Sequence, residues 1–494
     1  MMRIPFAGVL LSALLALPAY AQLDTLHSTK ESVIGGGRTV MRMADGALVA
    51  TFARAADNGR ELAYASSQDN GKTWQTTTVF AADRNGVSHS AIDSNFQGSY
   101  IAFVSTSNKQ NVARVAYTTD PLSTQRTFSV SDSLMPEDTA PVDGFIQASR
   151  AGWGEKADKN AETVAYGWQD ARSKNLYVGI SPDGKTFPKA RKILADPHAT
   201  SGPSVGIRGQ YVIVTYLTTD PAIVPSDVKA AGRSYQAWIE SRDGGNSWTK
   251  PQPLFGPTSA SYPSIDVTTV LPAKKASIQQ ARLSGGTNGR QAGILVWQAT
   301  PAGTDAGIVF VLSELSTSPA SNQYVGVVSF RPLTPGATWT HSIAGHPLVL
   351  GNAKAIEAYA KPSNRHFALQ NAATRQFQYS ALVDTPVRSA SYLETSKAMG
   401  TRLTVATSKD TGKTFDQVRS FSVAELQKFG LKDFGPDTVF KTSQCLFQDR
   451  DGQVYVDVLA HSLKGELQYA RLPVGANAQT IQASEAKGQR VAAN

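Results

Sequence analysis

One eight-residue phrase, S-x-D-x-G-x-T-W, constrains the fold more than any other feature of the chain. It first spans residues 67–74 as SQDNGKTW, returns at 241–248 and 408–415, and occurs one residue shorter at 181–187. Each copy follows one strand-like run and precedes another. In a tight turn an Asp side chain accepts backbone N–H groups and Gly supplies a positive φ. The repeats therefore predict four hairpin corners, whose structural aspartates are Asp69, Asp183, Asp243 and Asp410.

This spacing resembles the Asp-box (BNR) repeat of the sialidase-type β-propellers. The resemblance implies an all-β fold, a single β-propeller of four-stranded blades around a central channel. It also implies that the Asp boxes lie on the outer rim, away from the catalytic site. Because such a ring can absorb several hundred residues as one domain, we expect residues 22–474 to form one propeller.

The number of blades follows from the stretches that we interpret as innermost strands. Seven such starts occur, at Arg38, His89, Val142, Gly202, Tyr262, His346 and Ser443. The count is therefore seven blades, with six, the usual number in sialidases, as the alternative. Weaker corners at 119–128 and 335–339 fit the second and fifth units. A strand within 23–34 would complete the last blade and close the ring.

The N-terminus has the features of a secretory signal peptide. Arg3 precedes an apolar run, and residues 19–21 form a small-x-small cleavage site, which predicts a leader over residues 1–21. We expect cleavage after Ala21 and a periplasmic or secreted protein. No membrane span is expected, because no later apolar run is long enough.

Two further segments carry local signals. Residues 475–494 contain few large apolar side chains, which predicts a disordered tail. One short helix is expected at 423–429, after the cap candidate Ser422. Cys445 is the only cysteine, so an intrachain disulfide is impossible.

The charge balance indicates the class of partner. The formal net charge is +9, spread along the chain rather than gathered in runs. A diffuse positive field favours anionic partners, and for an exported protein an acidic glycan fits better than nucleic acid. Neither zinc-type spacing nor a P-loop nor a dinucleotide fingerprint is present, so we expect no metal and no cofactor.

The opening unit carries the most specific likeness to sialidases. There, an Arg leads into a strand, a D-G turn, a second strand and another Arg, before a catalytic Asp and the first Asp box. On that match Arg38 and Arg54 would bind a substrate carboxylate, and Asp57 would be the acid/base. The planar guanidinium of Arg suits bidentate pairing with a carboxylate. Arg233 resembles a further arginine of the family.

Other candidates come from the geometry of a propeller, whose inner strands converge on one mouth. Residues near their starts are expected to contact substrate, namely His89, His198, Tyr262 and His346. The match to sialidases also has departures. Ser443 stands where the family has its tyrosine nucleophile, and no Glu occurs between Glu162 and Glu240.

Three functions remain open at this point. The first is a glycosidase-type enzyme acting on an acidic glycan. The second is a non-catalytic propeller that binds a glycan or a protein in the cell envelope, which the missing tyrosine favours. The third is a polysaccharide lyase, in which His and Tyr side chains act as acid and base beside an Arg that neutralises a uronate.

Overall fold

The computed structural model of the chain describes residues 39–149, 163–256, 307–343, 375–432 and 443–474, with shorter gaps inside these ranges, and three strands at 264–266, 280–282 and 294–298. Most of these residues belong to β-strands, and very few are helical. The predicted all-β fold is therefore confirmed. The leader at 1–21, the closing strand within 23–34 and the tail at 475–494 lie outside the described residues and stay predictions.

The first four sheets each consist of four consecutive antiparallel strands in chain order. The first comprises β1 (Val40–Arg42), β2 (Leu48–Ala56), β3 (Gly59–Ser67) and β4 (Gln75–Phe80). The second comprises β5 (Val87–Asn95), β6 (Gly98–Ser107), β7 (Gln110–Thr118) and β8 (Ser129–Val130). The third comprises β9 (Pro141–Ala148), β10 (Val164–Asp170), β11 (Leu176–Ser181) and β12 (Arg191–Leu194). The fourth comprises β13 (Ala199–Arg208), β14 (Tyr211–Thr218), β15 (Tyr235–Ser241) and β16 (Gln252–Pro253).

The second half of the chain continues the pattern after an interruption. A separate two-stranded sheet pairs β17 (Ser264–Asp266) with β18 (Gln280–Arg282). The fifth four-stranded sheet comprises β19 (Ile294–Gln298), β20 (Gly307–Ser316), β21 (Tyr324–Pro332) and β22 (Thr340–Ile343). The sixth comprises β23 (Arg375–Ala381), β24 (Arg388–Ser396), β25 (Gly400–Ser408) and β26 (Gln417–Ser422). The last, of three strands, comprises β27 (Ser443–Gln448), β28 (Val454–His461) and β29 (Leu467–Val474).

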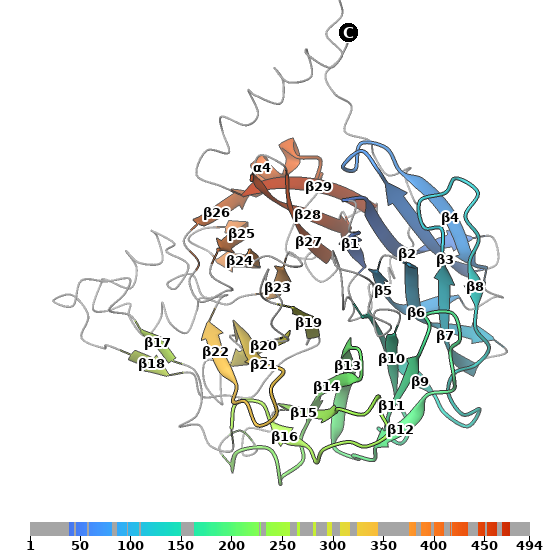
Figure 1. Cartoon of the computed structure of the whole chain (residues 1–494). Helices are drawn as coiled ribbons and strands as arrows, with labels where there is room; N and C mark the ends of the chain where they lie inside the picture. The colour runs from blue at the N-terminus through green and yellow to red at the C-terminus, as the bar shows by residue number, and fades with distance from the viewer. Residues whose placement is uncertain are drawn as a thin grey trace, which may run out of the picture.

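The sheets follow one another in a ring around a common centre (Figure 1). First strands of neighbouring sheets contact each other, as β5 does with β9 and β9 with β13. The ring closes where β27 of the last sheet contacts β1 of the first. This arrangement is that of a β-propeller. The number of blades stays a prediction, because parts of the fifth and sixth units lie outside the described residues.

Two expected strand starts differ in the structure. The fifth four-stranded sheet begins with β19 at Ile294 rather than near Tyr262, and the sixth begins with β23 at Arg375 rather than near His346. Between the third Asp box and β19, the described strands β17 and β18 pair with each other as a separate two-stranded sheet. The weak corner at 335–339 does lie between β21 and β22, as predicted.

Strand direction divides the ring into two faces. Because neighbouring strands are antiparallel, the connections from first to second and from third to fourth strand lie on one face. The starts of the first strands and the second-to-third connections lie on the other. We call these the Asp-box face and the mouth face. Asp69, Asp183 and Asp243 all occupy third-to-fourth connections, on the face opposite the starts of the first strands. Their assignment as structural rather than catalytic residues stays a prediction. Asp410 lies outside the described residues.

The corner of the first sheet shows how the phrase works. One carboxylate oxygen of Asp69 accepts from the Ser67 hydroxyl and from the Thr73 backbone N–H, both at 2.8 Å. The other accepts from the Thr73 hydroxyl at 2.6 Å. Gly71 has φ +83° and donates its N–H to Ser67, while Trp74 Nε1 donates to the Gly71 carbonyl. The phrase is therefore a self-contained turn.

The core lies in the seams between sheets. Strand β10 is buried at every residue, because the second sheet covers one of its faces and the fourth covers the other. Tyr166 and Trp168 are completely buried, and burial of each such side chain contributes roughly 1.5–3 kcal/mol.

The expected helix is present as α4 (Val423–Lys428), and Ser422 and Glu425 form its capping box. No helix among the described residues is long and apolar enough to cross a membrane.

Candidate functional site at the mouth face

A bulge recurs near the mouth end of four first strands. In β5, His89 and Ser90 together oppose the single residue Phe103 of β6. The same two-against-one pairing occurs in three other sheets: Asp143 and Gly144 against Trp168, Gly202 and Pro203 against Tyr216, and Gln376 and Phe377 against Tyr392. Each bulge thus lies opposite an aromatic residue of the second strand.

The four bulges lie at the same depth in their sheets. The third-strand partner of each aromatic stands four residues before the third strand ends, as Tyr177 does before Ser181 and Ala237 before Ser241. At Gly202 the two strands approach closely: a methyl group there would lie 2.8 Å from Cβ of Tyr216. Bulges bend a strand and re-aim its side chains, and they are common beside active sites.

The first sheet has the same aromatic position. Thr39 accepts a hydrogen bond from the Thr51 N–H at 2.9 Å, just before β1 begins. The next residue of β2 is Phe52, which pairs with Ala63, four residues before Ser67. In sequence Arg38 directly precedes Thr39, but it lies outside the described residues.

The fourth sheet presents His198 at the mouth face. Asp196, only 6% exposed, accepts from the His198 backbone N–H at 2.8 Å and from the Thr218 hydroxyl at 2.9 Å. These bonds fix the turn that leads into β13 and leave the His198 side chain exposed. Burial, and then the charges of Asp196 and Asp220, raise the pKa of the neighbouring Tyr216. Its phenol is therefore neutral at physiological pH.

Asp170 of the third sheet is likewise occupied by its own loop. Its carboxylate accepts from the backbone N–H groups of Ala140, Arg172 and Ser173 and from the Ser173 hydroxyl. Burial alone would raise the pKa of Asp170, but the Ser173 hydroxyl and the backbone donors together lower it. The carboxylate stays ionised and shapes the connection between β10 and β11.

The predicted site residues have different outcomes. His89 falls in the β5 bulge and His198 at the start of β13, so both strand positions are at the mouth end of their sheets. Arg54 pairs with Glu61 of β3 and donates to the Thr78 hydroxyl of β4 at 2.7 Å, so its guanidinium is held by its own sheet. The other predicted residues lie outside the described residues: Arg38, Asp57, Arg233, Tyr262 and His346.

A Tyr–Glu–Arg cluster that the sequence analysis missed lies on the opposite face. Tyr211 donates to Glu240 at 2.9 Å, and Arg331 donates to the Tyr211 oxygen at 2.9 Å and pairs with Glu240. Arg331 also packs over Trp238 and Trp339. Glu240 directly precedes the Asp-box residue Ser241. The cluster therefore joins the fourth and fifth sheets on the Asp-box face. In the sequence, the position of Glu240 directly before the Asp box was the one feature that could have indicated this placement.

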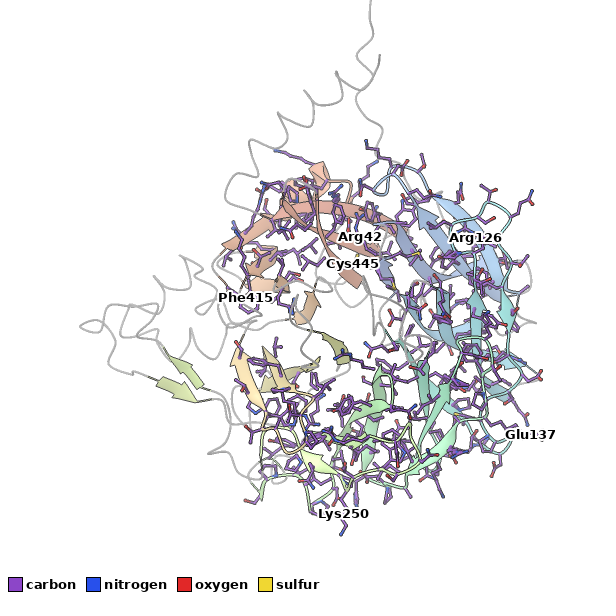
Figure 2. The ribbon with its side chains drawn as sticks, viewed as in Figure 1. Arg42, Arg126, Glu137, Lys250, Phe415 and Cys445 are labelled. Carbon is purple, nitrogen blue, oxygen red and sulfur yellow. The ribbon has the colours of Figure 1, made fainter. Side chains whose placement is uncertain are left out.

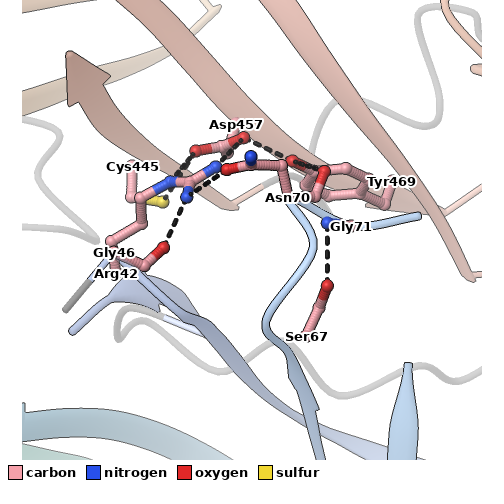
Figure 3. Close-up of polar contacts among 8 residues, drawn as sticks. All are labelled: Arg42, Gly46, Ser67, Asn70, Gly71, Cys445, Asp457 and Tyr469. Atoms are coloured by element: carbon pink, nitrogen blue, oxygen red, sulfur yellow. Dashed lines mark hydrogen bonds and ion pairs between the residues drawn. The ribbon is translucent and has the colours of Figure 1, made fainter. Parts of the chain in front are cut away.

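A second such cluster closes the ring on the same face (Figure 3). Arg42 Nε and Nη2 donate to the two carboxylate oxygens of Asp457 at 2.6 and 3.1 Å, and Tyr469 donates to the same carboxylate. Arg42 also donates to the Asn70 side chain, at 2.9 Å, within the first Asp box. The buried thiol of Cys445 lies 3.8 Å from Asp457, near Arg42 (Figure 2).

The part of the chain that the structure describes holds no group of three or more His, Cys, Asp or Glu residues placed to bind a metal. On the mouth face the described polar residues come from separate sheets, whereas the two Tyr–carboxylate–Arg clusters lie on the other face.

Comparison with known proteins finds likeness only at the level of structure. No family model matches the chain, and no curated protein matches it. A Trypanosoma rangeli sialidase in complex with the inhibitor DANA matches 96% of this chain at 11% identity with a TM-score of 0.37. An α-L-arabinofuranosidase from Lactobacillus brevis matches 61% of this chain, and 93% of its own length, at 11% identity with a TM-score of 0.32.

The chain spans 61% of the length of that sialidase. Sialidases, the family that the sequence resembles, are among the matched structures. At these identities and TM-scores the likeness carries no conclusion about activity or substrate.

Proposed function

We propose that this chain is a propeller enzyme of the glycosidase type that binds an acidic glycan at the mouth face. The observation that carries the proposal is the bulge that recurs at the mouth end of four first strands. A ring of re-aimed strand ends around one channel is a means of collecting side chains from several sheets into one site.

In this proposal Arg38 binds the carboxylate of the sugar. It directly precedes Thr39, so in sequence it falls where the other sheets bulge opposite an aromatic. Asp57, which follows the last residue of β2, is the acid/base. Arg54 lies three residues before Asp57, and its ion pair with Glu61 joins β2 to β3. In this proposal the pair holds the end of β2, and with it Asp57, in position.

The remaining contacts of the proposed site come from other sheets. They are His89, His198, Arg233, Tyr262 and His346. The formal net charge of +9 favours an anionic ligand over a neutral one. The leader over residues 1–21 would deliver the enzyme to the periplasm or the medium, where such glycans occur.

The deciding experiment is a screen of the mature protein against sialosides and uronate polysaccharides, with product analysis. Asp57→Asn is expected to abolish turnover and to leave binding intact, while Asp69→Asn, at a corner of the other face, should leave turnover per folded molecule unchanged. Turnover by Asp57→Asn equal to that of the parent would contradict the assigned role. Release of unsaturated uronate products would instead assign a lyase.

A binding role without catalysis is the second candidate, and one observation favours it. Asp170 and Asp196, the buried carboxylates described at the mouth face, already accept hydrogen bonds that fix their own loops. Ser443 also stands where sialidases have a tyrosine. Tight glycan binding with no product from any substrate, and only a modest change in affinity for Asp57→Asn, would establish this role.

A further inference from the structure

The outer edge of the third sheet carries a concentration of exposed cations. Residues 163–194 contain six Lys or Arg and two Asp, a formal charge of +4, whereas residues 110–138 of the second sheet contain two Arg and four acidic residues. The six cations are all exposed: Arg172, Lys174, Lys185, Lys189, Arg191 and Lys192. None of them forms an ion pair with another described residue.

These cations follow a line from one face of the ring to the other. Arg172 and Lys174 lie in the β10–β11 connection, at the mouth face. Arg191 and Lys192 lie on β12, the fourth strand of the sheet, on the outside of the ring (Figure 1). Lys185 and Lys189 lie in the connection that precedes β12, on the Asp-box face. We call the four cations of residues 185–192 the rim track.

The acidic groups nearby do not neutralise the rim track. The Asp183 carboxylate accepts hydrogen bonds within its own Asp box, from the backbone N–H groups of Lys185 and Thr186 and from the Thr186 hydroxyl. Asp132, Glu137 and Asp138 belong to the exposed segment that joins β8 to β9. That segment meets the track where the Ala190 N–H donates to the Leu134 carbonyl, and it meets the mouth end of the line where Arg172 donates to the Asp138 carbonyl at 3.1 Å. Both contacts are to backbone carbonyls rather than to carboxylates.

We propose that the rim track binds a linear anionic polysaccharide outside the mouth. An edge strand leaves one row of backbone groups unpaired, and neighbouring side chains point to opposite faces. A chain molecule lying along the edge can therefore meet both Arg191 and Lys192. Because the line of cations begins at the mouth face, a polymer whose end occupies the mouth could continue over the rim. This inference deepens the proposed function, but binding to the track does not require catalysis.

The surroundings favour a glycan over nucleic acid. Single-stranded nucleic acids bind proteins through aromatic stacking as well as charge. The one aromatic residue in the loop, Phe187, is partly buried against Tyr117 and Tyr166. The track thus offers charge and backbone polar groups without a stacking platform.

The test compares two variants that lose the same charge. In the first, Lys185, Lys189, Arg191 and Lys192 are replaced by Gln. In the control, four exposed lysines outside the third sheet are replaced by Gln: Lys72, Lys409, Lys428 and Lys432. Affinity for polygalacturonate and for polysialate is measured at low and moderate salt, with single-stranded DNA as a further probe and the melting temperature as a folding check.

The track variant should bind one of the two polysaccharides about tenfold or more weakly, with a shallower salt dependence, while the control changes by about threefold or less. An equal loss of affinity in both variants would mean that binding depends only on the net charge of the protein, and would overturn the proposal. Failure of the parent to bind either polysaccharide, or tighter binding of DNA through the same residues, would also overturn it. Turnover of a short substrate tests the mouth separately, because the track variant should retain it.

Discussion

The two faces of the ring use the same residue types in different ways. On the Asp-box face, Asp69 and Asp243 are saturated by hydroxyl and backbone donors from their own phrase, and Asp457 and Glu240 by buried arginines. On the mouth face, polar residues are supplied by strand starts of different sheets. Carboxylates on the first face hold the fold, and this contrast teaches that a Tyr, a Glu and an Arg in contact do not by themselves make an active site.

The clusters of the Asp-box face illustrate the point. Tyr211, Glu240 and Arg331 contact one another as a catalytic set would, yet they join the fourth and fifth sheets and are buried. Their position follows from strand direction, since Glu240 is next to the Asp box. The predictions below test whether the two faces separate stability from activity.

The largest expected effect is at the ring closure. Arg42 and Asp457 side chains are 6% and 0% exposed, and they pair across the junction of the first and last sheets. Replacing one member, as in Asp457→Asn, leaves the other charge buried and should cost about 3–5 kcal/mol in urea unfolding. Arg42→Met combined with Asp457→Leu should recover most of the loss. A loss below about 1 kcal/mol for Asp457→Asn would show that the closure does not depend on the pair.

Stability at acid pH should depend differently on the contacts between sheets and on the Asp-box turns. Burial lowers the pKa of His341, on β22 and beside Ser329 and Phe255, to about 4. The unfolded chain then binds more protons between pH 6.5 and 4, so stability falls by up to roughly 3 kcal/mol as the pH drops through that window. Hydrogen bonds from Ser247 and Ser241 lower the pKa of Asp243 to about 2, so this corner weakens only as the pH falls from about 4 towards 2.

His341→Gln is the variant that checks this assignment. It should flatten the unfolding free energy between pH 6.5 and 4 without changing the slope below pH 4. An unchanged slope in the upper window would place the responsible proton elsewhere.

At the mouth the expected effect is on binding. Arg38→Lys keeps the charge but loses the planar fork, so affinity for an acidic glycan, or its turnover, should fall about tenfold, near 1.4 kcal/mol. The melting temperature should hardly change. Equal binding of neutral and acidic glycans by the parent would remove the carboxylate from the proposal.

How far the sequence predicts this molecule depends on whether a signal is local. The phrase around Asp69 contains its own donors, acceptor and glycine, so three of the four corners could be placed from sequence, and the fourth lies outside the described residues. The cap at Ser422 is local in the same sense. Arg42 and Asp457 are 415 positions apart in the sequence, and no local sequence pattern predicts that they pair.

Only part of the bulge pattern could be predicted from the sequence. His89 and Gly202 were recognised as strand starts, but each irregular pairing also involves a residue of the next strand, Phe103 or Tyr216, which the starts alone do not reveal. Tyr262 and His346 were assigned to inner strands by analogy with the other starts. Both residues lie outside the described residues, and the described strands of those sheets begin later, at β19 and β23.

The smallest expected effect tests the other side of the comparison. Asp69→Ala removes the acceptor of two Thr73 bonds and one Ser67 bond. Burial raises the pKa of Asp69, but these bonds together lower it, so the ionised form is the one that stabilises the turn. Because the corner is largely solvated, the loss should be about 1 kcal/mol, close to that of a helix cap.

Asp69→Asn, which can still accept hydrogen bonds, should lose less. Turnover or glycan binding per folded molecule should be the same in the parent and both variants, since the corner lies on the face opposite the mouth. A fall in specific activity without a change in melting temperature would mean that the Asp-box face contributes to the site, and the division between the two faces would fail.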